Sequence, residues 1–153
     1  MLNSDFKEWL KLLNANNVEY LVVGGHALAA HGHPRYTGDI DIWISADATN
    51  VARVLDALSA FGFGSLGLTA ADLSTPGSVV QLGYPPTRID LMPSIDGVEF
   101  TGCFARRVVM SIDGIDVPII GIADFRANKL AVGRHQDLAD VEAITPNRGN
   151  DSG

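Results

Sequence analysis

The segment TGDIDIWIS, residues 37–45, alternates in the manner of a β-strand with one buried face. Its three isoleucines share one face, and Asp39 and Asp41 share the other with Trp43. Aspartate is disfavoured in strands, and two carboxylates whose Cα atoms lie roughly 6.5–7 Å apart on one face repel each other. Either both are solvated on an exposed edge strand, or they bind divalent cations, since Mg²⁺ prefers hard oxygen ligands. The all-isoleucine opposite face favours cation binding.

The rest of the chain predicts alternating helices and strands. A helix at 4–16 has apolar residues at helical spacing, and a nearly all-apolar strand at 19–25 leads into a short helix at 26–32. An Asp-Gly pair marks a hairpin within 106–120. The other predicted elements are strands at 39–44, 78–83 and 88–93, helices at 47–61, 122–132 and 136–144, and a helical turn at 69–75.

This order of elements indicates an α/β (α+β) domain with a mixed β-sheet and helices packed mainly on one face. The chain has 153 residues, of which 46% are hydrophobic and 19% are charged, so it can bury a substantial core. We expect a single domain at residues 1–145 and a flexible C-terminal tail at 146–153.

Charge and cysteine content restrict the classes of function. A net charge of −7 disfavours bulk nucleic-acid binding, which needs Lys and Arg at phosphates, but it leaves room for a local basic cleft. The single cysteine, Cys103, cannot form an intramolecular disulfide, and the N-terminus lacks the apolar run of a signal peptide. No stretch reaches the roughly 18 apolar residues that a membrane span needs. We therefore expect a soluble, cytoplasmic protein.

Two further features belong with the Asp pair. Gly24 and Gly25 lie where an apolar strand passes into a helix, and such a turn lets a phosphate approach backbone N–H groups, although it can also be purely structural. Asp90 lies alone in the apolar strand RIDLM. A carboxylate there is costly unless it binds a cation or forms a salt bridge, for which Arg88 and Arg106 are the nearest candidates.

In combination, these features resemble the nucleotidyltransferase superfamily of the DNA polymerase β type: a Gly-Gly turn, thirteen residues, Asp-apolar-Asp, and a later apolar-Asp-apolar strand. The segment GGHALAAHGHPRYTGDIDIWI is similar to small bacterial nucleotidyltransferases related to the abortive-infection toxins of toxin–antitoxin systems. The segments QLGYPPTRIDLMPSI and KLAVGRHQDLADVEAI look like their third-carboxylate strand and C-terminal helices. The resemblance covers about residues 18–144.

The resemblance implies transfer of a nucleoside monophosphate from a nucleoside triphosphate, such as ATP, to an acceptor hydroxyl on a protein, a tRNA or a small molecule. Asp39 and Asp41 would bind two Mg²⁺ ions roughly 3.5–4 Å apart. Asp90 would bind the catalytic ion and act as general base toward the acceptor. A partner toxin or antitoxin, or a second copy of the chain, would complete the site of so short a protein.

Groups that bind the triphosphate are expected around these carboxylates. The glycine pair and the backbone at His26 would hold the β- and γ-phosphates. Arg35 and Thr37 precede the Asp pair and would contact phosphate, and Lys129, on an otherwise apolar helix, would reach the triphosphate. For Arg35 and Lys129, a solvated surface charge is an equal alternative.

Two smaller expectations concern packing. Trp43 lies one step beyond Asp41 on the carboxylate face, and we expect it to pack in the core rather than against a nucleotide base. Arg134 and Asp137 are expected to form a salt bridge at the junction of two helices.

Two other functions stay open at the level of sequence. One is a non-catalytic antitoxin or regulatory module of the same fold that binds a nucleotide or a partner. The other is a metal-dependent phosphohydrolase that uses water as acceptor. The presence of all three carboxylates argues against the non-catalytic module, whereas the Gly-Gly turn favours a triphosphate substrate but does not distinguish water from another acceptor.

Overall fold

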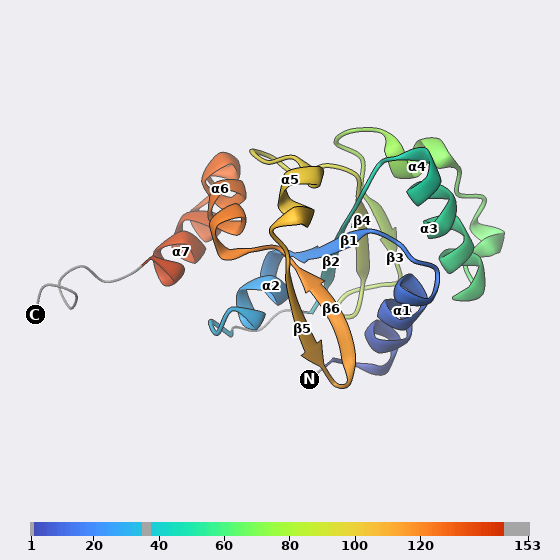
Figure 1. Cartoon of the computed structure of the whole chain (residues 1–153), viewed down its shortest axis with the longest axis horizontal. Helices are drawn as coiled ribbons and strands as arrows, with labels where there is room; N and C mark the ends of the chain where they lie inside the picture. The colour runs from blue at the N-terminus through green and yellow to red at the C-terminus, as the bar shows by residue number, and fades with distance from the viewer. Residues whose placement is uncertain (1, 35–37, 146–153) are drawn as a thin grey trace, which may run out of the picture.

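The computed structural model describes residues 2–34 and 38–145, which form one mixed sheet surrounded by helices (Figure 1). The predicted elements appear in the predicted order, with boundaries within a few residues of those expected, and the structure adds two short elements, at 64–66 and 100–105. The elements are α1 (Ser4–Ala15), β1 (Tyr20–Val23), α2 (Gly24–Ala30), β2 (Ile40–Ile44), α3 (Ala48–Ala60), the 3₁₀ turn η1 (Gly64–Leu66), α4 (Ala70–Ser74), β3 (Val80–Leu82), β4 (Ile89–Met92), α5 (Phe100–Ala105), β5 (Val108–Ile112), β6 (Ile115–Ile119), α6 (Ile122–Val132) and α7 (His135–Ile144).

The six strands stand in the order β3-β4-β2-β1-β6-β5. β2 pairs with β4 and β1 with β6 in parallel, whereas the other three neighbouring pairs are antiparallel. This mixed sheet confirms the predicted fold class. The hairpin predicted from the Asp-Gly pair joins β5 to β6, and its turn residues Asp113 and Gly114 have φ angles of 53° and 80°. Positive φ at both positions is what a two-residue hairpin turn of this kind requires.

The isoleucine face of β2 forms the centre of the core. Its three isoleucines are each at most 1% exposed and belong to one cluster with the buried apolar sides of α1 and α3. Fully burying each such side chain stabilises the fold by roughly 1.5–3 kcal/mol. β2 is therefore held in register, because a shift by one residue would turn its aspartates into this core.

The opposite face of β2 is apolar at one end and polar at the other. Trp43 is 1% exposed, and its ring meets Phe100 of α5 edge-on at 5.1 Å. Its indole N–H donates to the carbonyl of Pro93 at 3.4 Å. The packing role predicted for Trp43 is confirmed. α5 itself was not predicted, because six residues with a central glycine, FTGCFA, are too short to show a helical period.

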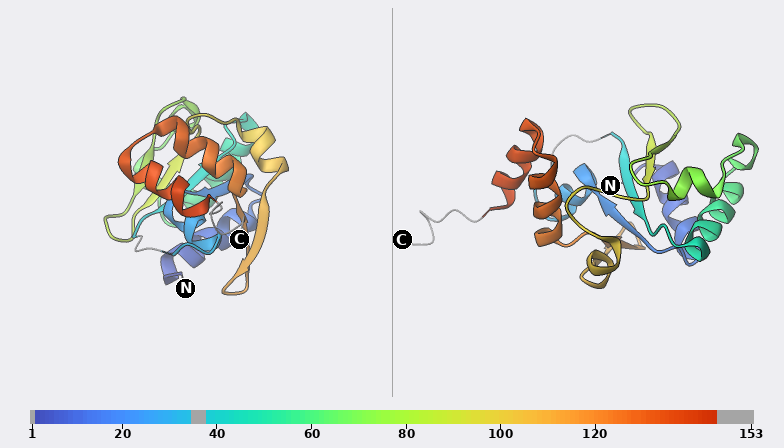
Figure 2. Two further views of the ribbon diagram at one scale, coloured as in Figure 1. Left: turned by 90° about the vertical axis from the view of Figure 1, so that its left-hand side faces the viewer. Right: turned by 90° about the horizontal axis from the view of Figure 1, so that it is seen from above.

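Most helices gather at two ends of the molecule, with α1, α3 and α4 at one end and α2, α6 and α7 at the other, while α5 lies between them (Figures 1 and 2). α6 ends at Gly133, whose φ of 72° lets the chain turn sharply into α7. α6 and α7 pack against each other as an antiparallel pair beside α2. Within the described ranges, no helix combines the length and the apolar character needed to cross a membrane.

Candidate active site

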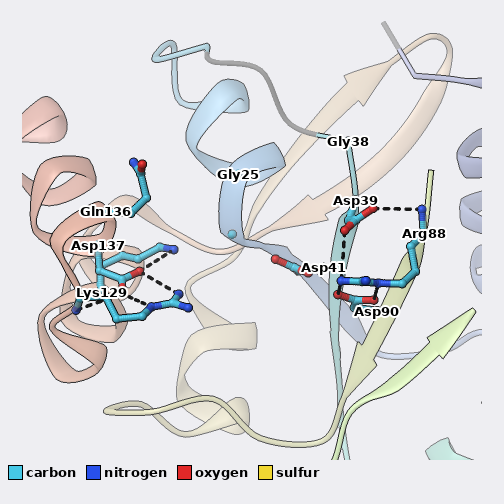
Figure 3. A pocket seen from close by; sticks show the side chains of 11 residues that line it. Gly25, Gly38, Asp39, Asp41, Arg88, Asp90, Lys129, Gln136 and Asp137 are labelled. Carbon is cyan, nitrogen blue, oxygen red and sulfur yellow. Dashed lines mark hydrogen bonds and ion pairs between the residues drawn. The ribbon is translucent and has the colours of Figure 1, made fainter. Parts of the chain in front are cut away.

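The carboxylates predicted to act together come from two neighbouring parallel strands. Asp41 of β2 and Asp90 of β4 are register partners, so their side chains leave the sheet side by side on one face (Figure 3). Asp39 lies on the same face, just before β2 begins. Asp90 is buried, at 7% exposure, whereas Asp39 and Asp41 are half-buried. The structure therefore brings the three predicted residues to one place.

Arg88 lies among these carboxylates. Its Nε and Nη2 donate to the two oxygens of Asp90 at 2.7 and 3.1 Å, and Nη2 also lies 3.1 Å from Oδ2 of Asp39. Its backbone N–H donates to the other oxygen of Asp39 at 3.1 Å. The salt-bridge alternative for Asp90 is thus realised with Arg88. The Arg106 alternative is wrong, because Arg106 forms a two-pronged salt bridge with Asp124 instead.

Asp41 has a different environment from its two neighbours. In the described part of the chain, no cation forms an ion pair with it. Burial, and then repulsion from Asp90, raise the pKa of Asp41 from 3.8 to about 6, partly opposed by Lys129. A carboxylate that is difficult to ionise beside two others is a place where an added cation would be strongly stabilised.

The glycine pair opens α2 directly next to Asp41. Gly24 has a φ of 68°, and a Cβ at this position would overlap the Asp41 carboxylate. Glycine is therefore required here for two reasons, the backbone conformation and the closeness of the carboxylate. Gly25, the second residue of α2, also faces the space in front of Asp41 (Figure 3).

A second group of charged residues faces the carboxylates from α6 and α7. The ammonium group of Lys129 lies 3.2 Å from Asp137 and 3.7 Å from Asp140. Arg134 also contacts Asp137, with Nε to Oδ2 at 2.7 Å, which confirms the predicted salt bridge. Hydrogen bonds from Arg134 lower the pKa of Asp137, which is fully buried. Lys129 is only 8% exposed, so its interpretation as a solvated surface charge is wrong.

These two groups line opposite sides of one polar cleft of about 420 Å³. A smaller cleft of about 280 Å³ adjoins it and shares Gly24, Asp41 and Lys129. The smaller cleft adds apolar side chains from β4, the loop after it and α6. The larger cleft is lined by Gly24, Gly25, Gly38, Asp39, Asp41, Arg88, Asp90, Lys129, Arg134, Gln136 and Asp137.

The remaining predicted site residues have different outcomes. Arg35 and Thr37 lie outside the described residues. His26 follows the glycine pair in α2, but it does not line the larger cleft. Its ring meets Phe6 edge-on at 5.6 Å, and within the described residues its Nε2 is buried with no hydrogen-bond partner. Burial lowers the pKa of His26. The prediction that its backbone binds phosphate stays a prediction.

Sequence reasoning missed Arg88, Arg134 and Gln136 as residues of the cleft. A signal for Arg88 was present, because residues two apart on a strand share a face and Arg88 precedes Asp90 by two. Arg134 and Gln136 lie at the start of α7, and only the fold of the α6–α7 pair brings them into the cleft that the carboxylates line.

The chemistry of the three carboxylates fits a hard divalent cation, which takes oxygen ligands. Asp41 adds a poorly compensated negative charge to this set. As the side chains stand, no group of three or more His, Cys, Asp and Glu residues encloses a single metal position within the described ranges. The Arg88 guanidinium pairs with both Asp39 and Asp90 in this arrangement. Cation binding by these carboxylates is part of the proposed function.

The sequence pattern of one protein family matches residues 2–145, almost the whole chain, and this family is described as a nucleotidyltransferase of unknown function (DUF6036). The chain belongs to this nucleotidyltransferase family. A comparison with curated proteins gave no significant match.

Two solved structures share the fold. A protein from Thermotoga maritima, described as a candidate nucleotidyltransferase, superposes with a TM-score of 0.63 at 13% identity, over 97% of this chain and 91% of that one. An antigenic nucleotidyltransferase-like protein from Paracoccidioides brasiliensis gives a TM-score of 0.55 at 15% identity, over 91% of this chain and 73% of that one. Both confirm the nucleotidyltransferase-like fold.

Proposed function

We propose that the protein is a Mg²⁺-dependent nucleotidyltransferase that moves a nucleoside monophosphate from a nucleoside triphosphate to an acceptor hydroxyl. The observation that supports this most strongly is the pairing of Asp41 with Asp90 on adjacent parallel strands, with Asp39 beside them, opposite the cationic residues of α6 and α7. The three carboxylates on one side suit cation binding, and Lys129 and Arg134 on the other, both paired with Asp137, can stabilise phosphate charge. These are the two needs of phosphoryl-type transfer.

Asp39, Asp41 and Asp90 would hold the Mg²⁺ ions. When bound, the ions would neutralise phosphate charge and polarise the reacting oxygens. Asp90 has a second role in this proposal, as the base that takes the proton from the acceptor hydroxyl. Its burial between β2 and β3 fixes its position, which favours transfer of the proton at one defined point of the cleft.

The triphosphate would bind between the glycine pair and the cations of α6 and α7. Gly24 and Gly25 allow close approach to the backbone, and Lys129 supplies charge from the opposite side. Arg134, whose side chain is 73% exposed, can turn toward a phosphate without losing a buried position. Arg35 and Thr37, which precede the Asp pair in sequence, remain proposed phosphate ligands.

The smaller cleft suits the nucleoside half of the substrate. It is continuous with the phosphate side through Asp41 and Lys129. Met92 and Ile95 offer apolar surface for a base, while Ser94 and Asn128 offer polar groups for its edge or for the ribose.

The acceptor is proposed by chemical class only, as a hydroxyl of a protein, a tRNA or a small molecule. The net charge of −7 disfavours tRNA. A cytoplasmic role within a toxin–antitoxin system, with a partner protein or a second copy of the chain completing the site, is the biological setting that the sequence resemblance favours.

A non-catalytic nucleotide- or partner-binding module is the alternative, and one observation favours it. Arg88 pairs with both Asp39 and Asp90, so the chain itself supplies a counter-charge to two of the three carboxylates. Such a module would bind a nucleoside triphosphate without releasing pyrophosphate.

The test is to incubate the protein with Mg²⁺, each nucleoside triphosphate and candidate acceptors, and to measure both nucleotide binding and pyrophosphate release. The active-site variant is Asp41→Asn, and the matched control is Asp56→Asn, an exposed aspartate of α3. We expect release that is lost in the first variant and kept in the second. Binding without release would support the module, and absence of both would refute the proposal.

A further inference from the structure

We infer that Arg88 is a built-in counter-ion of the active site, which competes with divalent cations for Asp39 and Asp90. When a cation binds, it takes the place of the Arg88 guanidinium at these carboxylates; we call this replacement the exchange. This inference rests on the proposed function and deepens it, since it concerns how the carboxylates of the same site are freed to bind cations.

The guanidinium already contacts the oxygens that a cation would need. Both oxygens of Asp90 accept hydrogen bonds from Arg88, at 2.7 and 3.1 Å, and Oδ2 of Asp39 lies 3.1 Å from its Nη2. The planar fork of arginine fits a carboxylate in this two-pronged manner better than any other side chain. A cation ligated by Asp90 must therefore replace these hydrogen bonds.

A guanidinium and a divalent cation do not share such a site. Like charges a few ångströms apart repel strongly inside a protein, where the effective dielectric constant is well below that of water, and the repulsion doubles against a divalent ion. The arginine must withdraw when the cation enters. The apparent affinity of the site for cations is accordingly weaker than three carboxylates alone would give.

The local structure lets the side chain move while the main chain stays fixed. The backbone N–H of Arg88 donates to Oδ1 of Asp39 at 3.1 Å, and Ile40 N–H donates to the Arg88 carbonyl at 3.0 Å. The side chain lines the cleft with 24% of its surface exposed. Rotation about side-chain bonds is enough to release it, and the freed guanidinium stays within reach of an anionic substrate in the same cleft.

The exchange explains how the protein stays folded with three clustered carboxylates. Without a counter-charge, buried Asp90 would be strongly destabilising, because an unpaired buried charge costs far more than a paired one. Arg88 supplies that charge until a cation does. The Arg88 guanidinium donates its two hydrogen bonds to Asp90 and not to Asp41, so a cation that approaches Asp41 does not first have to displace Arg88 from it.

The test is to measure Mn²⁺ binding by calorimetry for the wild type, Arg88→Gln and Arg134→Gln. The last variant removes an arginine from the same cleft without touching Asp39 or Asp90, so it measures the general effect of lost positive charge. We expect Arg88→Gln to bind Mn²⁺ about tenfold more tightly or better, and Arg134→Gln to change binding by no more than about threefold. Equal gains in both variants, or no gain in Arg88→Gln, would overturn the inference.

Two further measurements test the same inference independently. Arg88→Lys keeps the charge but loses the planar fork, so its affinity for Mn²⁺ should lie between those of the wild type and Arg88→Gln. If Arg88→Gln does not fold, a gain in Mn²⁺ affinity in Arg88→Lys supports the inference and no gain overturns it. In the wild type, the NMR signal of the Arg88 Nε–H should shift when diamagnetic Mg²⁺ is added, because its hydrogen bond to Asp90 is lost. A signal that is unchanged at saturating Mg²⁺ would contradict the exchange.

The inference and the proposed function fail in different ways. If Arg88→Gln gains cation affinity as expected but no variant releases pyrophosphate, the exchange stands and the nucleotidyltransferase activity is refuted. If the wild type releases pyrophosphate while Arg88→Gln shows no gain in cation affinity, the activity stands and the exchange is refuted.

Discussion

The carboxylate of Asp41 lies against Gly24, in the space that a Cβ at residue 24 would fill. This contact joins the two sequence motifs of the active site, the glycine pair at the start of α2 and the Asp pair of β2. Because β1 and β2 are antiparallel neighbours, the end of β1 meets the start of β2, and Val23 is the register partner of Asp41. The two motifs are thirteen residues apart in sequence and touch in the fold.

Gly24→Ala should therefore disrupt the site. The new methyl group would displace Asp41 and force a residue with a Cβ into a φ of 68°. We expect loss of nucleotide transfer and a decrease of about 1–3 kcal/mol in the free energy of unfolding. Gly67→Ala is the matched control, since Gly67 has a φ of 69° but open space where a Cβ would lie. Equal effects in the two variants, measured by chemical denaturation, would show that backbone strain alone is responsible.

Asp41→Asn should stabilise the metal-free protein at neutral pH. The pKa of Asp41 is raised from 3.8 to about 6, so the folded state binds its proton more tightly than the unfolded state does. The cost of ionising Asp41 in the fold is absent at low pH, grows as the pH rises from 3.8 to 6, and is constant above that range. We expect a gain on the order of 1–3 kcal/mol at pH 8 and almost none at pH 4.

The measurement for Asp41→Asn is urea denaturation at both pH values in the presence of a chelator. Asp56→Asn, on the exposed surface of α3, serves as the control and should show no such pH-dependent gain. A variant that is less stable than the wild type at pH 8 would mean that ionised Asp41 is compensated in the fold.

Asp137→Asn should destabilise the α6–α7 pair. Asp137 is fully buried and contacts both Lys129 and Arg134, so its loss leaves a buried ammonium group without its nearest carboxylate. We expect a decrease of about 2–4 kcal/mol in the free energy of unfolding at neutral pH. The pKa of Asp137 is lowered, so its contribution is present above its ordinary value of 3.8 and is lost as the pH falls further. Thermal and urea unfolding measure this decrease. The control Glu142→Gln, at an exposed position of α7, should have little effect in both experiments.

Much of this architecture could be predicted from periodicity. The strict alternation of β2 indicates which of its side chains face the core, and the Asp-Gly pair locates the β5–β6 turn. The shared face of Asp39 and Asp41 follows from the same alternation. Their proximity to Asp90 does not, because no local signal says that β4 lies beside β2 in parallel; that part came from the family resemblance and is confirmed by the strand register.

The counter-ion role of Arg88 and the burial of Lys129 lay beyond sequence reasoning. A charged residue on a strand or a helix has the same pattern whether water or a carboxylate surrounds it, and only the packing of distant elements decides between them. Lys129 is buried because α7 brings Asp137 and Asp140 against it. Arg88 is held in the cleft because β2 places Asp39 beside it across the strand pair.

Transfer of a nucleoside monophosphate is the central claim, and the most direct test follows the label of a nucleoside triphosphate. Purified protein is incubated with Mg²⁺, candidate acceptors, and substrate labelled at either the α- or the γ-phosphate. We predict that α-label appears on an acceptor while γ-label leaves as pyrophosphate, and that both signals vanish in Asp90→Asn. Release of γ-label as inorganic phosphate, or α-label found only as free nucleoside monophosphate, would identify a phosphohydrolase and contradict the claim.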